Sequence, residues 1–283
     1  MIANHNVHYV TILMGDGQGG FQAAEHSPMR VDVDPHPHAI ALADMDADGH
    51  DDLLIDHSPR GTPAPGLLRS SGGVLVIRGL GDGRFETRGA VLETGGIPYR
   101  GFEAVDINAD DRPDILTPHG EEVGVLLNTT ENDKFSSTRA QPVRATAPFA
   151  VRAADFNADG HPDMVVASGE DAAVVQIFFG DGRGGFEAAE GFATRLARGG
   201  KNIAIGDLNG DGVADAIVSA YGSDYILLIF GARDELTTAM LPTGFDHPWG
   251  LAAGDVNADG VDDLLVVGDG AREGRLYLSV PEQ

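Results

Sequence analysis

Residues 155–163 read Asp155-Phe156-Asn157-Ala158-Asp159-Gly160-His161-Pro162-Asp163, with an oxygen-bearing side chain at the first, third, fifth and ninth positions. The same pattern, Asp-x-Asx-x-Asp-(Gly/Asp)-x-x-Asp, begins again at Asp44, Asp106, Asp207 and Asp255. Side chains spaced in this way converge on one point only if a hard cation neutralises them, and Ca²⁺ takes roughly six to eight oxygen ligands. The five copies therefore predict about five structural calcium ions.

Within each copy we expect positions 1, 3, 5 and 9 to supply side-chain oxygen. Position 7 varies in residue type, so we expect it to supply its backbone carbonyl. The predicted ligands are Asp44, Asp46, Asp48, His50 and Asp52; Asp106, Asn108, Asp110, Arg112 and Asp114; Asp155, Asn157, Asp159, His161 and Asp163; Asp207, Asn209, Asp211, Val213 and Asp215; Asp255, Asn257, Asp259, Val261 and Asp263.

Gly at position 6 permits the positive φ of a tight wrap. In the second copy Asp111 takes that place, and Asp tolerates left-handed geometry better than most residues. We therefore expect the second copy to keep its shape and to bind metal with reduced affinity. The alternative is a set of Asp/Gly-rich turns without metal, and it applies most strongly to this second copy.

The copies are not EF-hands, because an EF-hand needs a glutamate at position 12 and a helix on each side. Position 12 is Ile55 in the first copy and Val166 in the third. Short apolar runs of strand length flank each copy, for example residues 39–43 before the first and 53–55 after it. Each loop is thus expected to join two neighbouring strands.

The five copies recur at spacings of 62, 49, 52 and 48 residues. A strand-based period near 50 is typical of a propeller built from four-stranded blades. A second motif falls half a repeat later, in residues 15–21, 81–85 and 180–186, with the core Gly-Asp-Gly and a following Phe. It predicts hairpin turns between the third and fourth strands of a blade.

Together the two motifs resemble the FG-GAP (or VCBS) repeat of integrin-α-type propellers, over nearly the whole chain. The resemblance implies an all-β fold, a β-propeller of four-stranded antiparallel blades in one domain over residues 1–283. We expect six blade positions, one of them incomplete, with five or seven as alternatives. The expected repeats are residues 1–30 (partial), 36–95, 99–140, 148–195, 200–245 and 248–283.

Residues 9–14 and 21–25 are expected to form the third and fourth strands of the incomplete first blade. Pairing of the two ends of the chain would close the ring. A fragment of a longer protein is the alternative. The chain is expected to be monomeric or part of a longer chain.

The net charge is −25, and there is no cysteine. This charge argues against nucleic acid and anionic membranes as partners. No apolar run is long enough to cross a bilayer. Calcium modules of low affinity suit calcium concentrations outside the cytosol, so the predicted location is extracellular, at the cell surface or periplasmic.

In propellers of the family that the chain resembles, ligands are held on the face opposite the metal loops. Six residues before each first Asp the chain carries a residue predicted to line the mouth of the central channel: His38, Arg100, Phe149, Lys201 and Trp249. Aromatic and basic side chains in such a ring suit a sugar ligand. Alternatively, Phe149 and Trp249 plug the channel or pack between blades. The insertion at residues 56–73 could overhang the same face.

The leading hypothesis is a non-catalytic recognition module, stabilised by calcium, for a glycan or an extracellular protein. A polysaccharide lyase is the main alternative, with Tyr99, Arg100, Lys201 and His38 as candidate groups. A structural segment of a larger adhesin or toxin complex is a third. The isolated residues His57, His119 and His247 are expected to be ordinary loop histidines.

Overall fold

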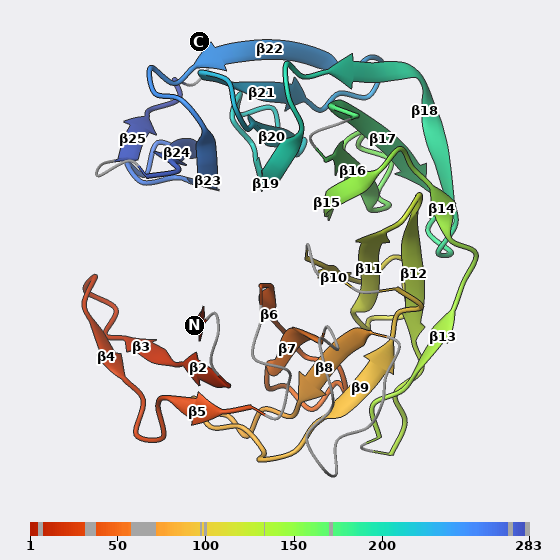
Figure 1. The fold of residues 1–283 in the computed structure, drawn as a ribbon, viewed down its shortest axis with the longest axis vertical. Helices are drawn as coiled ribbons and strands as arrows, with labels where there is room; N and C mark the ends of the chain where they lie inside the picture. The colour runs from red at the N-terminus through yellow and green to blue at the C-terminus, as the bar shows by residue number, and fades with distance from the viewer. Residues whose placement is uncertain are drawn as a thin grey trace. The chain divides into compact units, whose positions relative to one another are not determined.

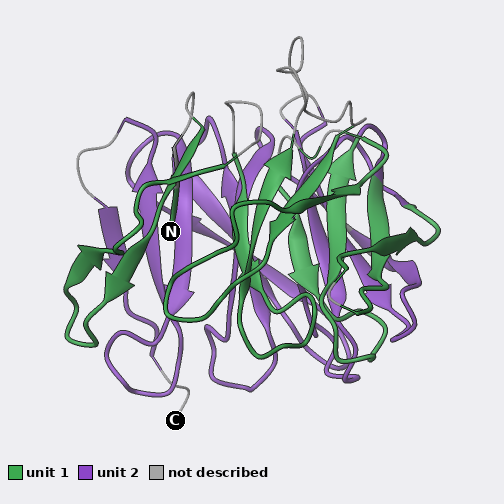
Figure 2. Ribbon diagram, turned by 90° about the horizontal axis from the view of Figure 1, so that it is seen from below, with its two compact units in different colours: residues 1–119, 123–142 green, residues 120–122, 143–283 purple. Residues whose placement is uncertain are grey.

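The computed structural model describes residues 1–4, 8–31, 38–57, 72–96, 98, 101–132, 134–169, 172–270 and 274–280. Every regular element among them is a β-strand, and none of them belongs to a helix long and apolar enough to span a membrane. The chain divides into two compact units, coloured separately in Figure 2. Unit 1 is residues 1–119 and 123–142, and unit 2 is residues 120–122 and 143–283.

Two sheets dominate unit 1, one of four strands and one of five, and consecutive strands are neighbours along the main path of each. The first consists of β6 (Ile40–Ala43), β7 (Asp52–His57), β8 (Gly73–Ile77) and β9 (Ala90–Glu93). The second contains β10 (Glu103–Val105), β11 (Asp114–His119), β12 (Glu122–Asn128) and β13 (Ser137–Arg139). The strands of the first sheet pair antiparallel throughout, which is the arrangement expected of a propeller blade.

The N-terminal part of unit 1 differs from the prediction. A three-stranded sheet contains β1 (Ile2–Asn4), β2 (Tyr9–Thr11) and β5 (Met29–Arg30), and a separate hairpin pairs β3 (Leu13–Gly15) with β4 (Phe21–Ala23). The expected single strand over residues 9–14 is interrupted at Ile12, whose N–H donates to Ser27 Oγ at 2.9 Å. The two halves consequently pair with different partners, β2 with β5 and β3 with β4.

Unit 2 begins with the short strand β14 (Val143–Arg144) and then forms three sheets (Figure 1). The first sheet has four strands, β15 (Pro148–Ala154), β16 (Asp163–Ser168), β17 (Val174–Gly180) and β18 (Phe186–Arg195). The second also has four, β19 (Gly200–Gly206), β20 (Asp215–Ala220), β21 (Tyr225–Phe230) and β22 (Thr237–Pro242). The third has three: β23 (Pro248–Gly254), β24 (Asp263–Gly268) and β25 (Gly274–Tyr277). Among the first strands of these sheets, β19 packs against β15 on one side and β23 on the other.

Each predicted metal loop closes the hairpin between the first and second strands of a sheet. The residue before the loop pairs with the ninth loop residue, as Ala154 pairs with Asp163 and Gly206 with Asp215. The expectation that each loop joins two neighbouring strands is therefore confirmed. The loops are called loop 1 (residues 44–52), loop 2 (106–114), loop 3 (155–163), loop 4 (207–215) and loop 5 (255–263) from here on.

The second motif forms tight turns as predicted. In residues 180–186 it connects β17 to β18, and Asp181 Oδ1 accepts the N–H groups of Arg183 at 2.8 Å and Gly185 at 2.9 Å. Asp16 does the same between β3 and β4. The aspartate side chain thus stands in for a backbone acceptor, which is the general reason that Asp favours turns.

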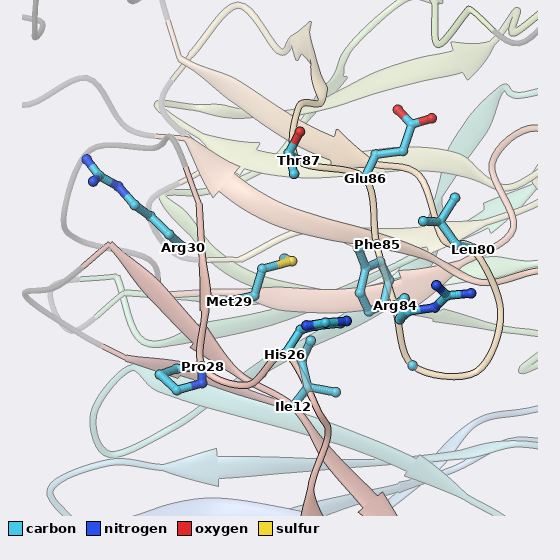
Figure 3. Close-up of a pocket in the computed structure, with 11 residues that line it drawn as sticks. Ile12, His26, Pro28, Met29, Arg30, Leu80, Arg84, Phe85, Glu86 and Thr87 are labelled. Carbon is cyan, nitrogen blue, oxygen red and sulfur yellow. The ribbon is translucent and has the colours of Figure 1, made fainter.

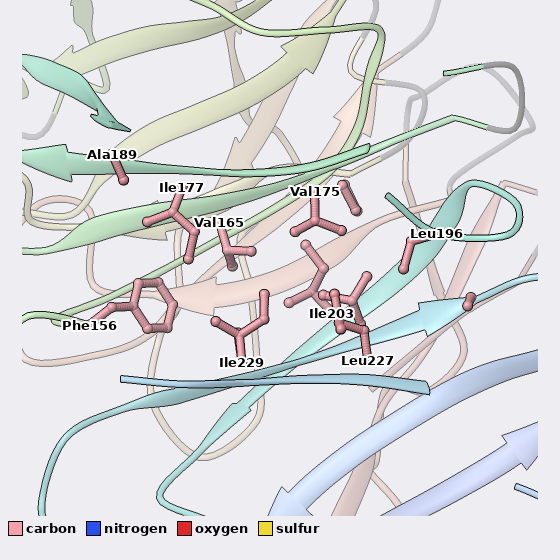
Figure 4. Close-up of a cluster of buried hydrophobic side chains, with 14 residues drawn as sticks. Phe156, Val165, Val175, Ile177, Ala189, Leu196, Ile203, Leu227 and Ile229 are labelled. Carbon is pink, nitrogen blue, oxygen red and sulfur yellow. The ribbon is translucent and has the colours of Figure 1, made fainter. Parts of the chain in front are cut away.

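The cores lie between neighbouring sheets, so the middle strands are buried on both faces. On β20, Ala216 and Val218 contribute to the cluster shared with the preceding sheet, shown in Figure 4, whereas Ile217 faces the cluster on the other side. All six residues of β16 and of β20 are buried. Burial of apolar side chains on both faces accounts for the nearly continuous apolar sequence of these strands.

Candidate functional site

The ninth residue of each metal loop is a buried aspartate that fastens the loop to the third strand of its sheet. In loop 3, Asp163 Oδ2 accepts the N–H of Phe156 at 2.9 Å, and Oδ1 accepts that of Gly180 at 2.9 Å. The other four copies repeat both bonds: Asp52 with Met45 and Gly79, Asp114 with Ile107 and Asn128, Asp215 with Leu208 and Gly231, Asp263 with Val256 and Ser279.

The first, third and fifth residues face one another inside the loop. In loop 3, Asp155 accepts the N–H groups of Asp159 at 3.1 Å and Gly160 at 2.8 Å. Asn157 Oδ1 accepts the Asp159 N–H at 2.9 Å, and Asp159 Oδ1 accepts the His161 N–H at 2.8 Å. Each oxygen keeps a lone pair after accepting one hydrogen bond, so these residues retain the capacity to coordinate a cation.

Two backbone positions in every loop have a positive φ. At position 6, φ is 90° for Gly160 and 65° for Asp111, so the expected left-handed geometry of the second loop is confirmed. At position 4, where the sequence gives Ala in four copies, φ is 56° for Ala158. The other position 4 residues are Ala47 (60°), Ala109 (59°), Gly210 (77°) and Ala258 (61°).

The side-chain oxygen atoms of the loops are the kind of ligand that calcium prefers. Carboxylate and amide oxygens are hard ligands, and Ca²⁺ accepts them in flexible geometry. In loop 1, one carboxylate oxygen each from Asp44, Asp46 and Asp48 lie within 4.8 Å of one another. Oδ1 of Asp46 is buried without a hydrogen-bond partner in the described structure, which is a condition that a bound cation would relieve.

The side chains at position 7 are directed to other partners. Arg112 Nη1 donates to the Thr130 carbonyl at 3.0 Å, and the ring of His161 lies against Gly182 of the following turn. These contacts leave the backbone carbonyl as the group that position 7 would offer to a metal. That role for position 7, like the other ligand assignments, stays a prediction.

Burial changes the acidity of the ninth residue. Desolvation raises the pKa of Asp52, Asp114, Asp163 and Asp215 from the ordinary value of 3.8 to about 6, even though two backbone N–H groups oppose the shift. The neighbouring loop carboxylates contribute to the same rise, because like charges disfavour ionisation. Without a cation the ionised loops are therefore electrostatically strained.

We expect Asp163→Ala to lower the free energy of unfolding by about 3 kcal/mol in saturating calcium. The substitution leaves the buried N–H groups of Phe156 and Gly180 without acceptors, at about 1–3 kcal/mol each, and removes a candidate ligand. Urea denaturation near neutral pH measures the change. Asp234→Ala, at an exposed position, is the control. A variant at Asp163 within about 0.5 kcal/mol of the wild type would contradict the anchoring role.

A second candidate site lies in unit 2, at the end of the strands opposite the metal loops. We call Phe149, Lys201, Tyr221, His247 and Trp249 the aromatic cluster. Lys201 Nζ lies 4.4 Å from the centre of the Phe149 ring and 5.2 Å from that of Tyr221. Tyr221 in turn meets His247 at 5.0 Å and Trp249 at 5.3 Å, edge to face.

Hydrogen bonds between loops hold Tyr221 in this cluster. The N–H of His247 donates to the Ser223 carbonyl at 3.0 Å, and the N–H of Asp269 donates to the His247 carbonyl at 2.8 Å. The Tyr221 hydroxyl donates to Asp269 Oδ2 at 3.2 Å. His247 has φ 58°, and backbone strain of this kind is found preferentially at functional sites.

The structure brings three of the five predicted ligand-binding residues together. Phe149 packs partly against the core, whereas the Trp249 side chain is 45% exposed, so it does not act as a buried plug. In unit 1, His38 donates its backbone N–H to Asp56 Oδ1 at 2.7 Å. Arg100 lies outside the described residues. The position of Tyr221 was missed, because it falls outside the regular spacing.

Two of the three histidines expected in loops are strand residues. His57 and His119 are the last residues of β7 and β11, and His57 is buried. Each sits five residues after the ninth loop residue of its copy, so the strand simply extends further than the apolar pattern indicates. His247 is in a loop, as expected, but it belongs to the aromatic cluster.

Most of the other candidate functional residues lie outside the residues that the structure describes. Of the candidate lyase groups, Tyr99 and Arg100 lie outside the described residues, as does most of the insertion at 56–73. The catalytic alternative and the overhanging insertion therefore stay predictions.

A pocket of about 610 Å³ opens in unit 1, and none of the predicted ligand-binding residues that the structure describes lines it (Figure 3). Its lining combines apolar side chains with His26, Arg30, Arg84 and Glu86. Those four side chains are all exposed, and Arg84 is already paired with Asp82 at 2.9 Å. The pocket is large enough for a small ligand, but none of the described residues that line it is both polar and buried.

Comparison with known proteins supports the fold. Residues 155–218 match the family described as FG-GAP-like repeat. A search of curated protein sequences gives no significant match. A periplasmic gluconolactonase of Pseudomonas aeruginosa has a TM-score of 0.66 at 17% identity, over 98% of this chain and 74% of that chain.

A lectin of Agrocybe aegerita that recognises non-reducing terminal N-acetylglucosamine has a TM-score of 0.59 at 15% identity, over 97% of this chain and 81% of that chain. The biofilm matrix protein Bap1 of V. cholerae has a TM-score of 0.46 at 17% identity, over 89% of this chain and 36% of that chain. The gluconolactonase and the lectin are β-propellers, and together with the successive four-stranded antiparallel sheets they show that this chain has the β-propeller fold.

Proposed function

Since the chain is an FG-GAP repeat β-propeller, we propose that it is a calcium-stabilised recognition module that binds a glycan at its aromatic cluster. The metal loops are structural and hold the hairpins, and the recognition surface lies at the opposite end of the same strands. The observation that carries the proposal is the half-exposed Trp249 against Tyr221, beside the ammonium group of Lys201.

The chemistry of the aromatic cluster suits a sugar. An exposed indole offers an apolar face to the C–H groups of a pyranose ring, while the hydroxyl of Tyr221, the ammonium of Lys201 and the carboxylate of Asp269 offer hydrogen bonds to its hydroxyls. The net charge of −25 disfavours polyanionic ligands, so a neutral glycan is the better candidate. The lectin of Agrocybe aegerita, a propeller of similar fold, recognises terminal N-acetylglucosamine.

The calcium concentration outside the cytosol suits structural sites of this kind. Sites of low affinity, with Kd of roughly 10⁻⁴–10⁻³ M, fill only where calcium reaches millimolar levels. We therefore place the protein outside the cell or in the periplasm, where the Pseudomonas aeruginosa gluconolactonase of similar fold also resides. The loops would supply an all-oxygen ligand set, and the cation would neutralise their carboxylates.

A glycan array, probed with the intact protein in calcium, tests the proposal. We expect binding to a defined neutral glycan. In isothermal titration with that glycan, Trp249→Ala is expected to weaken the affinity by about tenfold or more, equal to about 1.4 kcal/mol, and Tyr221→Phe by a few-fold. Phe21→Ala, at an exposed aromatic residue of unit 1, is the matched control and is expected to change nothing.

A blank array from a folded, calcium-bound protein would overturn the glycan assignment and favour a protein ligand or a structural role. Binding that survives Trp249→Ala and Tyr221→Phe unchanged would place the recognition surface elsewhere on the propeller.

A further inference from the structure

Loop 1 departs from the other loops at its third position. Loops 2 to 5 carry Asn there, and the amide Nδ2 donates to the aspartate at position 5, as Asn157 donates to Asp159 at 2.9 Å. The same bond joins Asn108 to Asp110, Asn209 to Asp211 and Asn257 to Asp259. Loop 1 has Asp46 in this place. An ionised carboxylate has no proton to donate, so Asp46 and Asp48 repel each other instead.

A second departure lies beside loop 1, at the end of the third strand. Gly79 donates its N–H to Asp52, and the residue before it is Arg78. In the other four copies the residue before the corresponding N–H donor is apolar: Leu127, Phe179, Phe230 and Leu278. Of the five copies, the one with the extra carboxylate is thus also the one with an arginine at this place.

The two unusual residues are in direct contact. Arg78 Nη2 lies 2.5 Å from Asp46 Oδ2, and the side chains are 16% and 1% exposed. The guanidinium carbon of Arg78 is also 5.5 Å from the centre of the Phe135 ring. Burial raises the pKa of Asp46, and the charge of Arg78 is the main influence that lowers it. The two residues therefore form an ion pair between loop 1 and the end of the third strand.

At the predicted ligand positions, loop 1 has the same net charge as the other loops when Arg78 is included. At the predicted ligand positions loop 1 has four carboxylates, from Asp44, Asp46, Asp48 and Asp52, and loops 2 to 5 have three each. Adding one guanidinium to loop 1 leaves three negative charges, the same as in the others. Because Oδ1 of Asp46 remains buried without a hydrogen-bond partner, loop 1 keeps a free ligand oxygen next to this fixed cation.

We propose that Arg78 is a resident cation of loop 1 that competes with calcium for Asp46 and sets the affinity of this loop. Loop 1 therefore binds calcium more weakly than loops 3, 4 and 5. It also keeps its conformation better than those loops when calcium is withdrawn. The inference rests on the proposed calcium binding, and it adds a residue outside the repeat motif that tunes one site separately from the rest.

The test is calcium titration of the intact protein by isothermal titration calorimetry. In the wild type we expect the loop 1 site to be weaker than those of loops 3, 4 and 5 by roughly tenfold, since a unit positive charge at contact distance opposes a divalent ion. In Arg78→Leu, which installs the residue type of the other copies, that site is expected to tighten by about tenfold or more. Arg78→Lys keeps the charge and should remain weak, and Arg84→Leu, at an exposed arginine of unit 1, is the control.

Hydrogen exchange gives a second readout. In EDTA, the amides of residues 48–50 are expected to stay protected in the wild type and to lose protection in Arg78→Leu, whereas those of loop 3 exchange in both. The double variant Asp46→Asn with Arg78→Leu should restore an ordinary loop, with affinity equal to that of loop 3.

An Arg78→Leu affinity equal to or weaker than that of the wild type, with calcium bound elsewhere, would overturn the role of Arg78 alone. Absence of calcium binding to the folded wild type would overturn the calcium proposal as well.

Discussion

Removal of calcium by EDTA is expected to lower the free energy of unfolding by about 5 kcal/mol. A site with Kd near 10⁻⁴ M in ~1 mM calcium stabilises the folded state by about 1.4 kcal/mol, so loops 3, 4 and 5 give about 4 kcal/mol, and the weaker loops 1 and 2 add less than about 1 kcal/mol each. Total stabilities are typically about 5–15 kcal/mol, so calcium would supply a large share. For a chain of this size the melting temperature is expected to fall by about 10–20 °C.

Differential scanning calorimetry with calcium, with magnesium and with EDTA measures this effect. Magnesium should rescue little, because it prefers strict octahedral geometry and retains its waters. The turn variants Asp16→Asn and Asp181→Asn should keep the full calcium dependence, since these residues lie outside the metal loops. An unchanged melting curve in EDTA would remove the structural role of calcium.

The metal loops were the most predictable part of the chain, because their geometry is local. An Asp that accepts N–H groups four and five residues ahead bends the chain by itself, as Asp155 does toward Asp159 and Gly160. The left-handed backbone of Asp111 followed from the Gly that occupies this place elsewhere. The strand pairing followed as well, since each loop joins the paired ends of two strands.

The left-handed alanines at position 4 were not predicted. Sequence reasoning reserves positive φ for Gly and Asn, since a Cβ costs about 1 kcal/mol or more there. In loop 3 the N–H of Asp159, the residue after Ala158, donates to the side-chain oxygens of Asp155 and Asn157. These hydrogen bonds offset the backbone strain at Ala158. The backbone preference of a single residue therefore does not predict a positive φ whose energetic cost is offset by hydrogen bonds elsewhere in the loop.

The aromatic cluster was only half predictable. Repeat spacing located Phe149, Lys201 and Trp249, because they occupy equivalent places before their loops. Tyr221 follows the second strand of its sheet, and its partners His247 and Trp249 come from the next repeat. Contacts between neighbouring repeats depend on how the sheets pack, and no period within one repeat encodes them.

The metal-free protein is expected to be more stable near pH 5 than near pH 7.5. Burial raises the pKa of Asp52, Asp56, Asp114, Asp163 and Asp215 to about 6, so the folded state binds protons more tightly than the unfolded chain. This contribution is complete below the unfolded value of 3.8 and is lost as the pH rises through 6. Each group recovers about 1 kcal/mol between about pH 7.5 and pH 5, so the five give about 5 kcal/mol.

Calcium is expected to reverse this dependence, because coordination requires ionised carboxylates and protons compete with the metal. Asp16 and Asp181 act in the opposite sense, since backbone hydrogen bonds lower their pKa from the ordinary value of 3.8, and they leave this window unaffected.

Urea denaturation in EDTA and in calcium, at both pH values, separates the two effects. Asp163→Asn removes one titrating group, so in EDTA it should show a pH dependence smaller by about 1 kcal/mol. A metal-free protein that loses stability steadily from pH 7.5 to pH 5 would mean that the ninth loop residues are ionised at little cost. The carboxylates would then be satisfied by their backbone N–H groups alone, and the loops would need no cation to hold their shape.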